Sequence, residues 1–543
     1  MCKRTRAGLA VAAFALLVGG FEGSAPAESG PPRLLGLRVS NGGTPFAGDT
    51  PWLATVSPNG DGYRDRALLR FKLDHAATVR VLVVATDEID RLVKTIWSTR
   101  RRLGAGAHTI VWRPARHTPE RTYLVRFVAS GLDGGRRVYG YEPPRPHRLT
   151  SGLVVRVQGI QAGFLARSYP VGGDATVAIA TDARRVRLQL FSFEKVPRPT
   201  VRDLRTGGSA VAPPVRLDWQ RRGSATRYVQ ISHAGVSRSG LYFLRVTAAD
   251  GRVGYAPLIL RPRKLGEHKV AVVLSTNTWQ AFNFLDANGD GWGDSWNVGG
   301  GTRTVDLRRP YLDFGVPVRF RDWDLSVISW LERTGKAADY LSDDDLDRVR
   351  TGEELRRAYD VLVFPGHEEY VSSHAYDVVR RYRDLGGRLM FLSANNFFWK
   401  VARQGPLLKR VQPWRRQRRP EASLVGVQWA ASKHGGRRAP YVVQPGAPAW
   451  ALTGTGLRSG STFGRYGIEL DSRAPSSPPG TRVLARIPNL VGKHDAEMTY
   501  YEGPAGSRVF AAGVVNFAAS ITEPAVSRLV DNVWARLQRQ PGY

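Results

Sequence analysis

The sequence predicts a multidomain protein in which two β-sandwich-like modules precede an α/β domain. In the first half, apolar and polar residues alternate in short runs between turn residues, which is typical of β-strands. In the second half, continuous apolar runs alternate with apolar residues at helical spacing, which indicates a mostly parallel sheet covered by helices. The length of 543 residues allows three or four domains.

The N-terminus predicts a signal peptide over residues 1–27. Lys3, Arg4 and Arg6 precede an apolar run over residues 7–21, which is shorter than the ~20 residues of a membrane-spanning helix. Ala25-Pro26-Ala27 then offers the small-residue pattern of a cleavage site. We therefore expect a secreted or cell-envelope protein with no transmembrane segment in the mature chain. An uncleaved anchor is the alternative.

Cysteine content and charge restrict the chemistry. The only cysteine is Cys2, inside the expected signal peptide, so the mature chain offers no disulfide, thiolate metal site or cysteine nucleophile. The net charge of +32 favours polyanionic partners. For an exported protein we expect an anionic envelope polymer rather than a specific nucleic acid. The densest basic run, residues 409–419, suits such a polymer, although a solvated basic loop would have the same composition.

Residues 34–141 predict an immunoglobulin-like β-sandwich. The turn SPNGDG at residues 57–62 is followed by runs of alternating apolar residues at 69–73 and 79–83. Together with a G-x-H-x-x-x-W strand ending at Trp112 and a TYLVRF strand at 122–127, this order resembles the FlgD-type immunoglobulin-like module. The resemblance implies a spacer or adhesion unit.

Residues 150–262 predict a second β-rich module. Its LYFLRV segment at 241–246, followed by Asp250-Gly251, repeats the TYLVRF segment at 122–127 with Asp133-Gly134. Two similar hairpins near two domain ends indicate two sandwiches in tandem.

Residues 268–543 predict the α/β domain. Continuous apolar strands are expected at 270–274, 361–364 and 389–392, with helices after the first two and a closing helix over 526–537. In such a sheet, ligands lie beyond the carboxyl ends of the strands. Polar stretches follow all three strands, so the expected pocket residues are Asn277, Trp279, Phe282, Asn283, Tyr370, Asn395, Asn396 and Trp399.

These stretches carry a family resemblance. The motifs NTWQAFN at 277–283, PGHEEY at 365–370 and SANNFFW at 393–399 resemble the catalytic-domain pattern of the N,N-dimethylformamidase large (beta) subunit. The segment SGLY at 239–242 resembles the end of the module that precedes it there. The resemblance covers roughly residues 150–540. It implies an α/β domain similar to the class I glutamine amidotransferase fold and an amide substrate, but no glutaminase chemistry, because the cysteine nucleophile is missing.

The resemblance also implies a metal site. The family enzyme holds iron through two tyrosines and a glutamate, and such hard oxygen ligands suit iron(III). By motif, Glu369 matches the glutamate, Tyr242 one tyrosine and His367 a histidine that moves protons. The other tyrosine falls at Phe282, which has no oxygen, so the resemblance implies an incomplete iron site. Singly, Tyr242 could be a core residue, His367 a helix cap and Glu369 the partner of an arginine.

A second metal candidate is the loop DANGDG. Asp286, Asn288, Asp290 and Asp294 repeat the ligand spacing of a calcium loop, but position twelve is Asn297 where an EF-hand has glutamate. A weak calcium site and a loop of Asx-turns are both compatible with this pattern.

Two functions follow from the sequence. One is a secreted hydrolase of C–N bonds in a small polar or amide substrate, acting at His367 and Glu369. The other is a non-catalytic binding or adhesion protein for an anionic envelope polymer. For the first function we expect Tyr242, Asn277, Glu369 and Asn395 to converge at one edge of the sheet.

Overall fold

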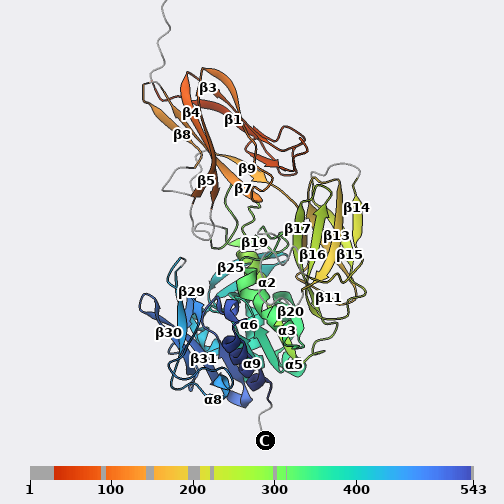
Figure 1. Ribbon diagram of the computed structural model, residues 1–543, viewed down its shortest axis with the longest axis vertical. Helices are drawn as coiled ribbons and strands as arrows, with labels where there is room; N and C mark the ends of the chain where they lie inside the picture. The colour runs from red at the N-terminus through yellow and green to blue at the C-terminus, as the bar shows by residue number, and fades with distance from the viewer. Residues whose placement is uncertain are drawn as a thin grey trace, which may run out of the picture.

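The computed structural model describes residues 30–86, 93–131, 133–141, 152–193, 208–219, 225–297, 302–312, 315–433 and 435–539. The expected signal peptide lies outside these residues. Two β-modules and an α/β body make up the described chain, the first module above the body and the second beside it (Figure 1). Among the described residues, no helix is long and apolar enough to cross a membrane.

The first module packs two sheets over one core. The smaller sheet has the order β1-β3-β6, and the larger has the order β2-β9-β7-β4-β5, with β8 paired to β7. Val79, Val81 and Val83 all enter the core, because side chains alternate along a strand. The strands are β1 (Leu34–Ser40), β2 (Leu53–Val56), β3 (Ala67–Leu73), β4 (Ala77–Thr86), β5 (Val93–Leu103), β6 (Gly106–Trp112), β7 (Arg121–Ser130), β8 (Arg136–Tyr139) and β9 (Leu153–Val157).

Strand β9 joins the first module, although the sequence places its residues in the second. It pairs in parallel with β2 and antiparallel with β7. Val155 and Val157 thereby complete the core of the first module. The chain crosses from one module to the other only after this strand.

The second module is built in the same way, from two sheets over one core. Their orders are β10-β12-β15 and β11-β17-β16-β13-β14. The strands are β10 (Gln161–Phe164), β11 (Ser168–Pro170), β12 (Asp174–Ala180), β13 (Arg185–Ser192), β14 (Val215–Asp218), β15 (Arg227–Ser232), β16 (Gly240–Ala248) and β17 (Val253–Arg261).

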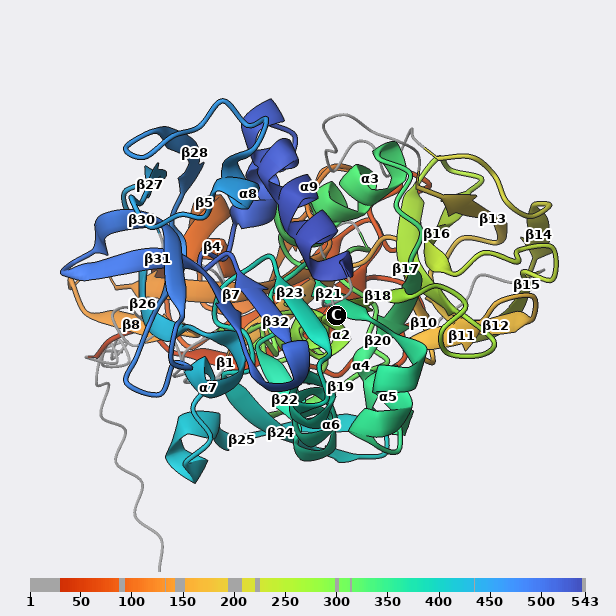
Figure 2. The same cartoon turned by 90° about the horizontal axis from the view of Figure 1, so that it is seen from below.

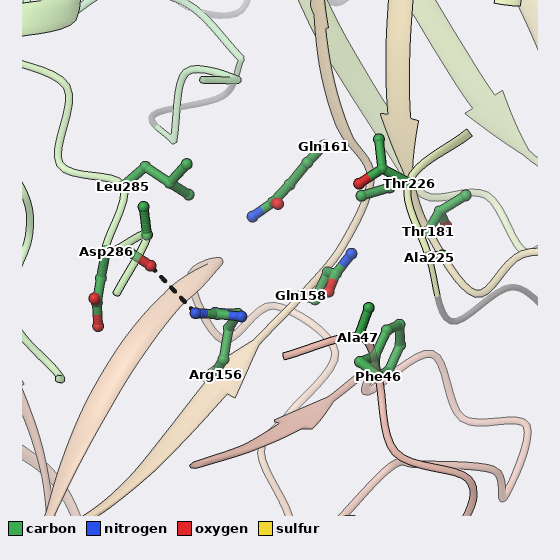
Figure 3. A pocket seen from close by; sticks show the side chains of 12 residues that line it. Phe46, Ala47, Arg156, Gln158, Gln161, Thr181, Ala225, Thr226, Leu285 and Asp286 are labelled. Atoms are coloured by element: carbon green, nitrogen blue, oxygen red, sulfur yellow. Dashed lines mark hydrogen bonds between the residues drawn. The ribbon is translucent and has the colours of Figure 1, made fainter. Parts of the chain in front are cut away.

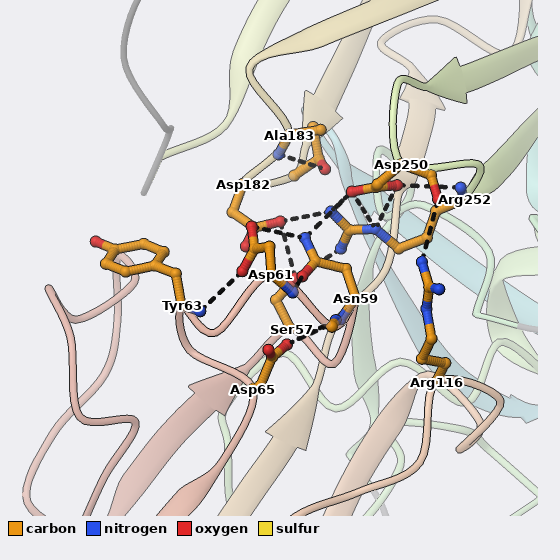
Figure 4. Close-up of polar contacts among 12 residues, drawn as sticks. Ser57, Asn59, Asp61, Tyr63, Asp65, Arg116, Asp182, Ala183, Asp250 and Arg252 are labelled. Atoms are coloured by element: carbon orange, nitrogen blue, oxygen red, sulfur yellow. Dashed lines mark hydrogen bonds and ion pairs between the residues drawn. The ribbon is translucent and has the colours of Figure 1, made fainter.

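A polar network joins the two modules (Figure 4). Arg252 donates to Ser57 Oγ at 2.6 Å, to Asp182 at 2.8 Å and to Asp250 at 2.6 Å. The Asn59 side chain also donates to Asp250, at 3.2 Å. The SPNGDG turn of the first module is therefore fastened to the second module by buried and half-buried charge-assisted hydrogen bonds.

The α/β body contains a nine-stranded sheet of order β20-β18-β21-β23-β32-β31-β30-β27-β28. The first five strands pair in parallel and the rest antiparallel. The strands are β18 (Val270–Leu274), β20 (Asp339–Ser342), β21 (Val361–Phe364), β23 (Arg388–Phe391), β27 (Ala439–Val443), β28 (Thr462–Tyr466), β30 (Arg482–Val491), β31 (His494–Glu502) and β32 (Arg508–Ala511).

Helices cover both faces of the parallel strands (Figure 2). Val272 on β18 packs in the core shared with α3 and α9, whereas its neighbour Val273 packs in the core shared with α4, α5 and α6. Burial on both faces explains why this strand is continuously apolar. The helices are α2 (Thr276–Ala281), α3 (Ser326–Arg333), α4 (Asp343–Arg348), α5 (Gly352–Ala358), α6 (Ser373–Asp384), α7 (Ala422–Val425), α8 (Ala449–Leu452) and α9 (Pro524–Gln538).

Two small sheets lie at the edge where the parallel strands end. One has the order β19-β25-β24-β22 and the other pairs β26 with β29. Their strands are β19 (Thr304–Asp306), β22 (Tyr370–Ser372), β24 (Trp399–Gln404), β25 (Leu407–Pro413), β26 (Gln428–Lys433) and β29 (Ile468–Ser472). They enclose the loops that follow β21 and β23.

Candidate functional site

The predicted polar stretches meet beyond the carboxyl ends of β18, β21 and β23. Helix α2 directly follows β18, and Asn277 on it donates to the Tyr370 carbonyl at 3.1 Å. The backbone N–H of Glu369 donates to Thr278 Oγ1 at 3.1 Å. The backbone N–H of Trp399 donates to the Glu369 carbonyl at 2.9 Å. Helix α2 and the stretch after β23 are thus both hydrogen-bonded to the PGHEEY segment.

At the centre of this region, His367 and Glu369 form a buried pair. Nε2 of His367 lies 3.1 Å from Glu369 Oε2, and Nδ1 lies 2.8 Å from the Ala394 carbonyl. His367 is 1% exposed and Glu369 is 5% exposed. Because a carbonyl only accepts, Nδ1 carries a proton, and Nε2 is left to face the carboxylate.

The carboxylates around His367 keep its imidazole protonated. Burial by itself lowers the pKa of His367, but the hydrogen bond and charge of Glu369, with the charge of Glu469 and the Ala394 carbonyl, raise it to about 9. The imidazole is therefore a cation at neutral pH. The pair is best described as imidazolium and carboxylate.

Aromatic rings wall this pair. The ring centroids of Phe282 and Trp323 lie 5.6 and 5.2 Å from that of His367. Tyr370 meets Phe282 edge-on at 5.8 Å and also packs on Trp296. These rings exclude water, which strengthens the electrostatic interaction inside the site.

Asn395 lies next to the pair in an unusual backbone conformation. Its φ angle is 55°, in the left-handed region that asparagine tolerates better than most residues. Its backbone N–H donates to both oxygens of Asp471, and its Nδ2 donates to Glu469 at 3.0 Å. Its Oδ1 is buried and has no hydrogen-bond partner among the described residues. The site thus holds one acceptor that a ligand N–H could use.

The sequence did not reveal two acids of this cluster, Glu469 and Asp471. Both lie on β29 and flank Leu470, which packs in the core, so they share the opposite face of the strand. Burial raises the pKa of Asp471 to about 7, opposed by the hydrogen bonds from Asn395. The alternating E-L-D pattern was the only signal, and no motif drew attention to it.

Three further carboxyl groups are buried, and of these only Glu368 lies in a motif singled out from the sequence. Burial raises the pKa of Asp324 to about 7, although it accepts a hydrogen bond from Trp279. Asp343 accepts from the Thr276 hydroxyl and the Asn277 N–H. Burial and the nearby charge of Asp343 hold the pKa of Glu368 well above its usual range. Gly366 fits beside them because a Cβ there would lie 2.3 Å from Asp324 Oδ1.

Several predicted pocket residues support loops in the structure. Asn283 donates to Gln280 and to the Pro310 carbonyl, and Asn396 donates to the Ser393 carbonyl while accepting from Glu368 N–H. Trp399 is half-buried, with the Arg410 guanidinium 4.9 Å from its ring centroid. These side chains hold the site's framework and do not contact the His367–Glu369 pair through any described hydrogen bond.

Tyr242, which was expected at the site, makes its described hydrogen bond within the second module. Its hydroxyl donates to the Arg238 carbonyl at 2.8 Å, and its ring packs in the core of the second module. In the first module, Tyr123 donates in the same way to the Pro119 carbonyl at 2.8 Å. Both bonds span four residues, as in the tyrosine corner of immunoglobulin-like sandwiches. The repeat that relates Tyr242 to Tyr123 therefore explains Tyr242 structurally.

The implied iron does not fit the donors present. Of the two tyrosines and one glutamate, Phe282 supplies no oxygen, Tyr242 belongs to a tyrosine corner, and only Glu369 remains. Among the described residues, no group of three or more His, Cys, Asp or Glu side chains is arranged to hold a metal ion.

The calcium-like loop uses its carboxylates to hold its own backbone. Asp286 accepts from the N–H groups of residues 289, 290 and 291, Asp290 accepts from Asn288 and residue 292, and Asp294 accepts from residue 287. The bond from the N–H of residue 292 to Asp290 is an Asx-turn bond, and the others also tie the loop to itself. The loop also docks on the first module, where the Trp292 and Tyr141 ring centroids lie 5.9 Å apart and Arg156 donates to the Asp286 carbonyl.

A polar cavity of about 150 Å³ lies beside this loop (Figure 3). It is lined by the first module at Phe46, the second at Gln161 and Thr226, and the α/β body at Leu285 and Asp286. Asp286 is the only predicted site residue in its lining. The cavity therefore belongs to the junction of the three parts.

Comparison with known proteins identifies one family. The family model described as "N,N-dimethylformamidase beta subunit-like, C-terminal" matches residues 218–529, more than half of the chain. The N,N-dimethylformamidase beta subunit of Paracoccus aminophilus is 30% identical over 166 residues, covering 29% of this chain and 21% of the relative. That of an Alcaligenes species is 37% identical over 78 residues, covering 14% of this chain and 10% of the relative. The matches thus span about a fifth or less of these relatives.

Two solved structures have a weak likeness to this chain. The mmIFT52 N-terminal domain has a TM-score of 0.26 and 13% identity, covering 39% of this chain and 88% of that one. Trypsin-activated alpha-2-macroglobulin from Escherichia coli has a TM-score of 0.22 and 10% identity, covering 42% and 17%.

Proposed function

This chain belongs to the N,N-dimethylformamidase beta subunit-like C-terminal family, and from that premise we propose that its α/β body hydrolyses the C–N bond of a small amide. The observation that carries the proposal is the buried contact between His367 and Glu369, at the edge of the sheet where ligands of α/β proteins bind. The order of the parallel strands, with helices on both faces, supports a fold similar to class I glutamine amidotransferases.

The chemistry follows from the two charged groups. Hydrolysis joins the oxygen of water to the carbonyl carbon and breaks the C–N bond, and the nitrogen leaves as an amine after it takes up a proton. Glu369 is suited to accept the proton of the attacking water and to return it to the leaving nitrogen. The imidazolium of His367 stabilises the negative charge that develops on the substrate oxygen, since the surrounding rings exclude water.

Asn395 supports a preference among amides. Its Oδ1 is buried without a described partner, and leaving such an acceptor unsatisfied costs about 1–3 kcal/mol. An amide that carries an N–H can satisfy it, whereas a tertiary amide cannot. We therefore propose primary or secondary amides as substrates in preference to N,N-dimethylformamide, the compound in the relatives' name.

Amine release from a panel of primary, secondary and tertiary small amides tests this function. We expect Glu369→Gln to lower kcat/KM by at least about 100-fold, because it removes the base and keeps the shape of the side chain. Glu332→Gln is the matched control. Glu332 lies on α3 and pairs with Arg238, and this variant should retain wild-type activity. Full activity in Glu369→Gln, or no amine release from any amide by the wild type, would refute the proposal.

A further inference from the structure

The outer face of the larger sheet in the first module carries rows of arginine. The register places Arg102 on β5, Thr78 on β4, Ser130 on β7 and Arg136 on β8 in one row. The next row contains Arg100, Arg80, Val128 and Val138, and the third contains Ser98, Leu82 and Arg126. We call this surface the arginine face, defined by Arg80, Arg100, Arg102, Arg126 and Arg136.

No acid in the described part of the chain pairs with the arginine face. None of its five arginines forms an ion pair with a described residue, and none of the rows contains an acid. Arg80 and Arg100 stand directly opposite each other in the register, an arrangement that is destabilising for like charges. Four of the five side chains are exposed. Arg126 is half-buried, and its Nε has no hydrogen-bond partner within the described ranges.

Protection of a sheet edge does not explain this surface. Charged residues often prevent edge strands from pairing with other chains, and Arg100 and Arg102 on the edge strand β5 would serve that purpose. Arg80 and Arg126, however, lie on β4 and β7, which have strands on both sides. Their charges do not protect an edge, and they repel the neighbouring arginines. A bound anion is therefore the simpler explanation for these two residues.

We propose that the arginine face binds a flexible, linear, phosphate-bearing polyanion. Arg80 and Arg100 are neighbours across two strands, about 4.8 Å apart, and Arg100 and Arg102 are about 7 Å apart along β5. Each guanidinium can bind a phosphate through two hydrogen bonds. Four strands side by side present a continuous surface, whereas reading of duplex DNA uses a helix or a two-stranded ribbon that enters a groove. The first two rows contain no aromatic side chain that would anchor in a lipid surface.

The basic run at 409–419 is a poorer candidate than the sequence indicated. Arg415 pairs with Glu421, and Arg419 pairs with Asp377 at 3.0 Å. The Arg410 guanidinium lies over the rings of Trp296 and Trp399. Much of this charge therefore stabilises the α/β body. Its exposed members, Lys409, Arg416 and Arg418, offer a matched control.

The test measures binding of fluorescein-labelled inorganic polyphosphate by anisotropy, over a range of salt concentrations. The variant combines Arg80→Ser, Arg100→Ser and Arg102→Ser, and the control combines Lys409→Ser, Arg416→Ser and Arg418→Ser, which removes equal charge. We expect the variant to bind at least about 30-fold more weakly and the slope of log K against log salt to fall by about 2–3. The control should stay within about threefold of wild type. Unchanged melting curves show that both remain folded.

Three results would overturn the proposal. The first is equal weakening in the variant and the control, since net charge alone would then explain binding. The second is no binding of polyphosphate by the wild type. The third is tighter binding of duplex DNA, or of vesicles of anionic phospholipid, than of polyphosphate, because either result would assign the face to another class of partner.

Discussion

His367 and Glu369 are charged groups kept where water scarcely reaches them. Removing an ion pair from water costs several kcal/mol per ion, and mutual attraction repays this cost only with good geometry. Here the second imidazole nitrogen is bonded to the Ala394 carbonyl, and further acids surround the pair. Apolar residues of similar size would fill this space at no such cost. The presence of a buried ion pair at this place is therefore better explained by a role in a reaction than by a contribution to the stability of the fold.

The pH dependence of unfolding should report this pair. The pKa of His367 is raised from 6.5 to about 9, so its stabilisation is complete below pH 6.5 and disappears as pH rises through 9. We expect the free energy of unfolding of the wild type to fall across this window by up to about 3 kcal/mol. His367→Gln should flatten the curve there, whereas His108→Gln, in the first module, should not. Denaturant titrations at a series of pH values measure this, and an unchanged curve in His367→Gln would contradict the ion pair.

Buried acids act in a lower window. The pKa values of Asp324 and Asp471 are raised from 3.8 to about 7, so their folded forms hold protons that the unfolded chain has lost. The contribution of these groups to the free energy of unfolding therefore decreases as pH rises from about 4 to about 7. The His367 measurement starts above most of this range, which keeps the two contributions apart.

Tyr242 offers a second test at the scale of one residue. We expect Tyr242→Phe to destabilise the protein by about 0.5–1.5 kcal/mol through loss of its hydrogen bond to the Arg238 carbonyl, and Tyr123→Phe to do the same in the first module. Amide hydrolysis should be unaffected by either change. Loss of activity in Tyr242→Phe, with Tyr123→Phe still active, would mean that Tyr242 acts in the site.

At the scale of elements, apolar patterns located the central strands well and the site framework only in part. Strand β18 at Val270–Leu274 and β21 at Val361–Phe364 lie where continuous apolar runs predict them, and Ser372 caps α6 through Ala375 N–H. Pairing over long sequence distances could not be predicted in this way. Strand β9 has the same local pattern whichever module it joins, and β29 brings Glu469 and Asp471 to the site from about 100 residues downstream of His367.

The motif of the loop over residues 286–294 is compatible both with a weak calcium site and with a loop of Asx-turns. Its carboxylates accept backbone N–H groups, and it packs against the first module through Trp292. A ligand raises the melting temperature only when it binds the folded state. Because the carboxylates of this loop already accept hydrogen bonds from the loop itself, we expect millimolar calcium to leave the melting temperature within about 1 °C of its value in a chelator. Differential scanning calorimetry measures this. A rise of several degrees with calcium, lost in Asp290→Asn, would establish a calcium site instead.

At the scale of the whole molecule, two β-modules and the α/β body share polar and apolar contacts. The network at Arg252 joins the modules, and the loop at Trp292 joins the first module to the body. The sequence predicted this order of parts from hydrophobic periodicity, and the repeat of Tyr123 at Tyr242 indicated two similar sandwiches. The resemblance also implied a ligand role for Tyr242, which stays a prediction beside its hydrogen bond to the Arg238 carbonyl. The resemblance of residues 34–141 to the FlgD-type module stays a prediction.

We propose that amide hydrolysis by this protein depends on Glu369 and His367 and not on iron. The most direct measurement is the rate of amine release, from an amide bearing an N–H, by preparations of the wild-type protein whose iron content is varied by chelation and reconstitution. We predict iron well below one per chain, because Phe282 has no oxygen and the Tyr242 hydroxyl is hydrogen-bonded to the Arg238 carbonyl. We also predict a rate that does not change with iron content. A rate that rises in proportion to bound iron, reaching its maximum at one iron per chain, would contradict it.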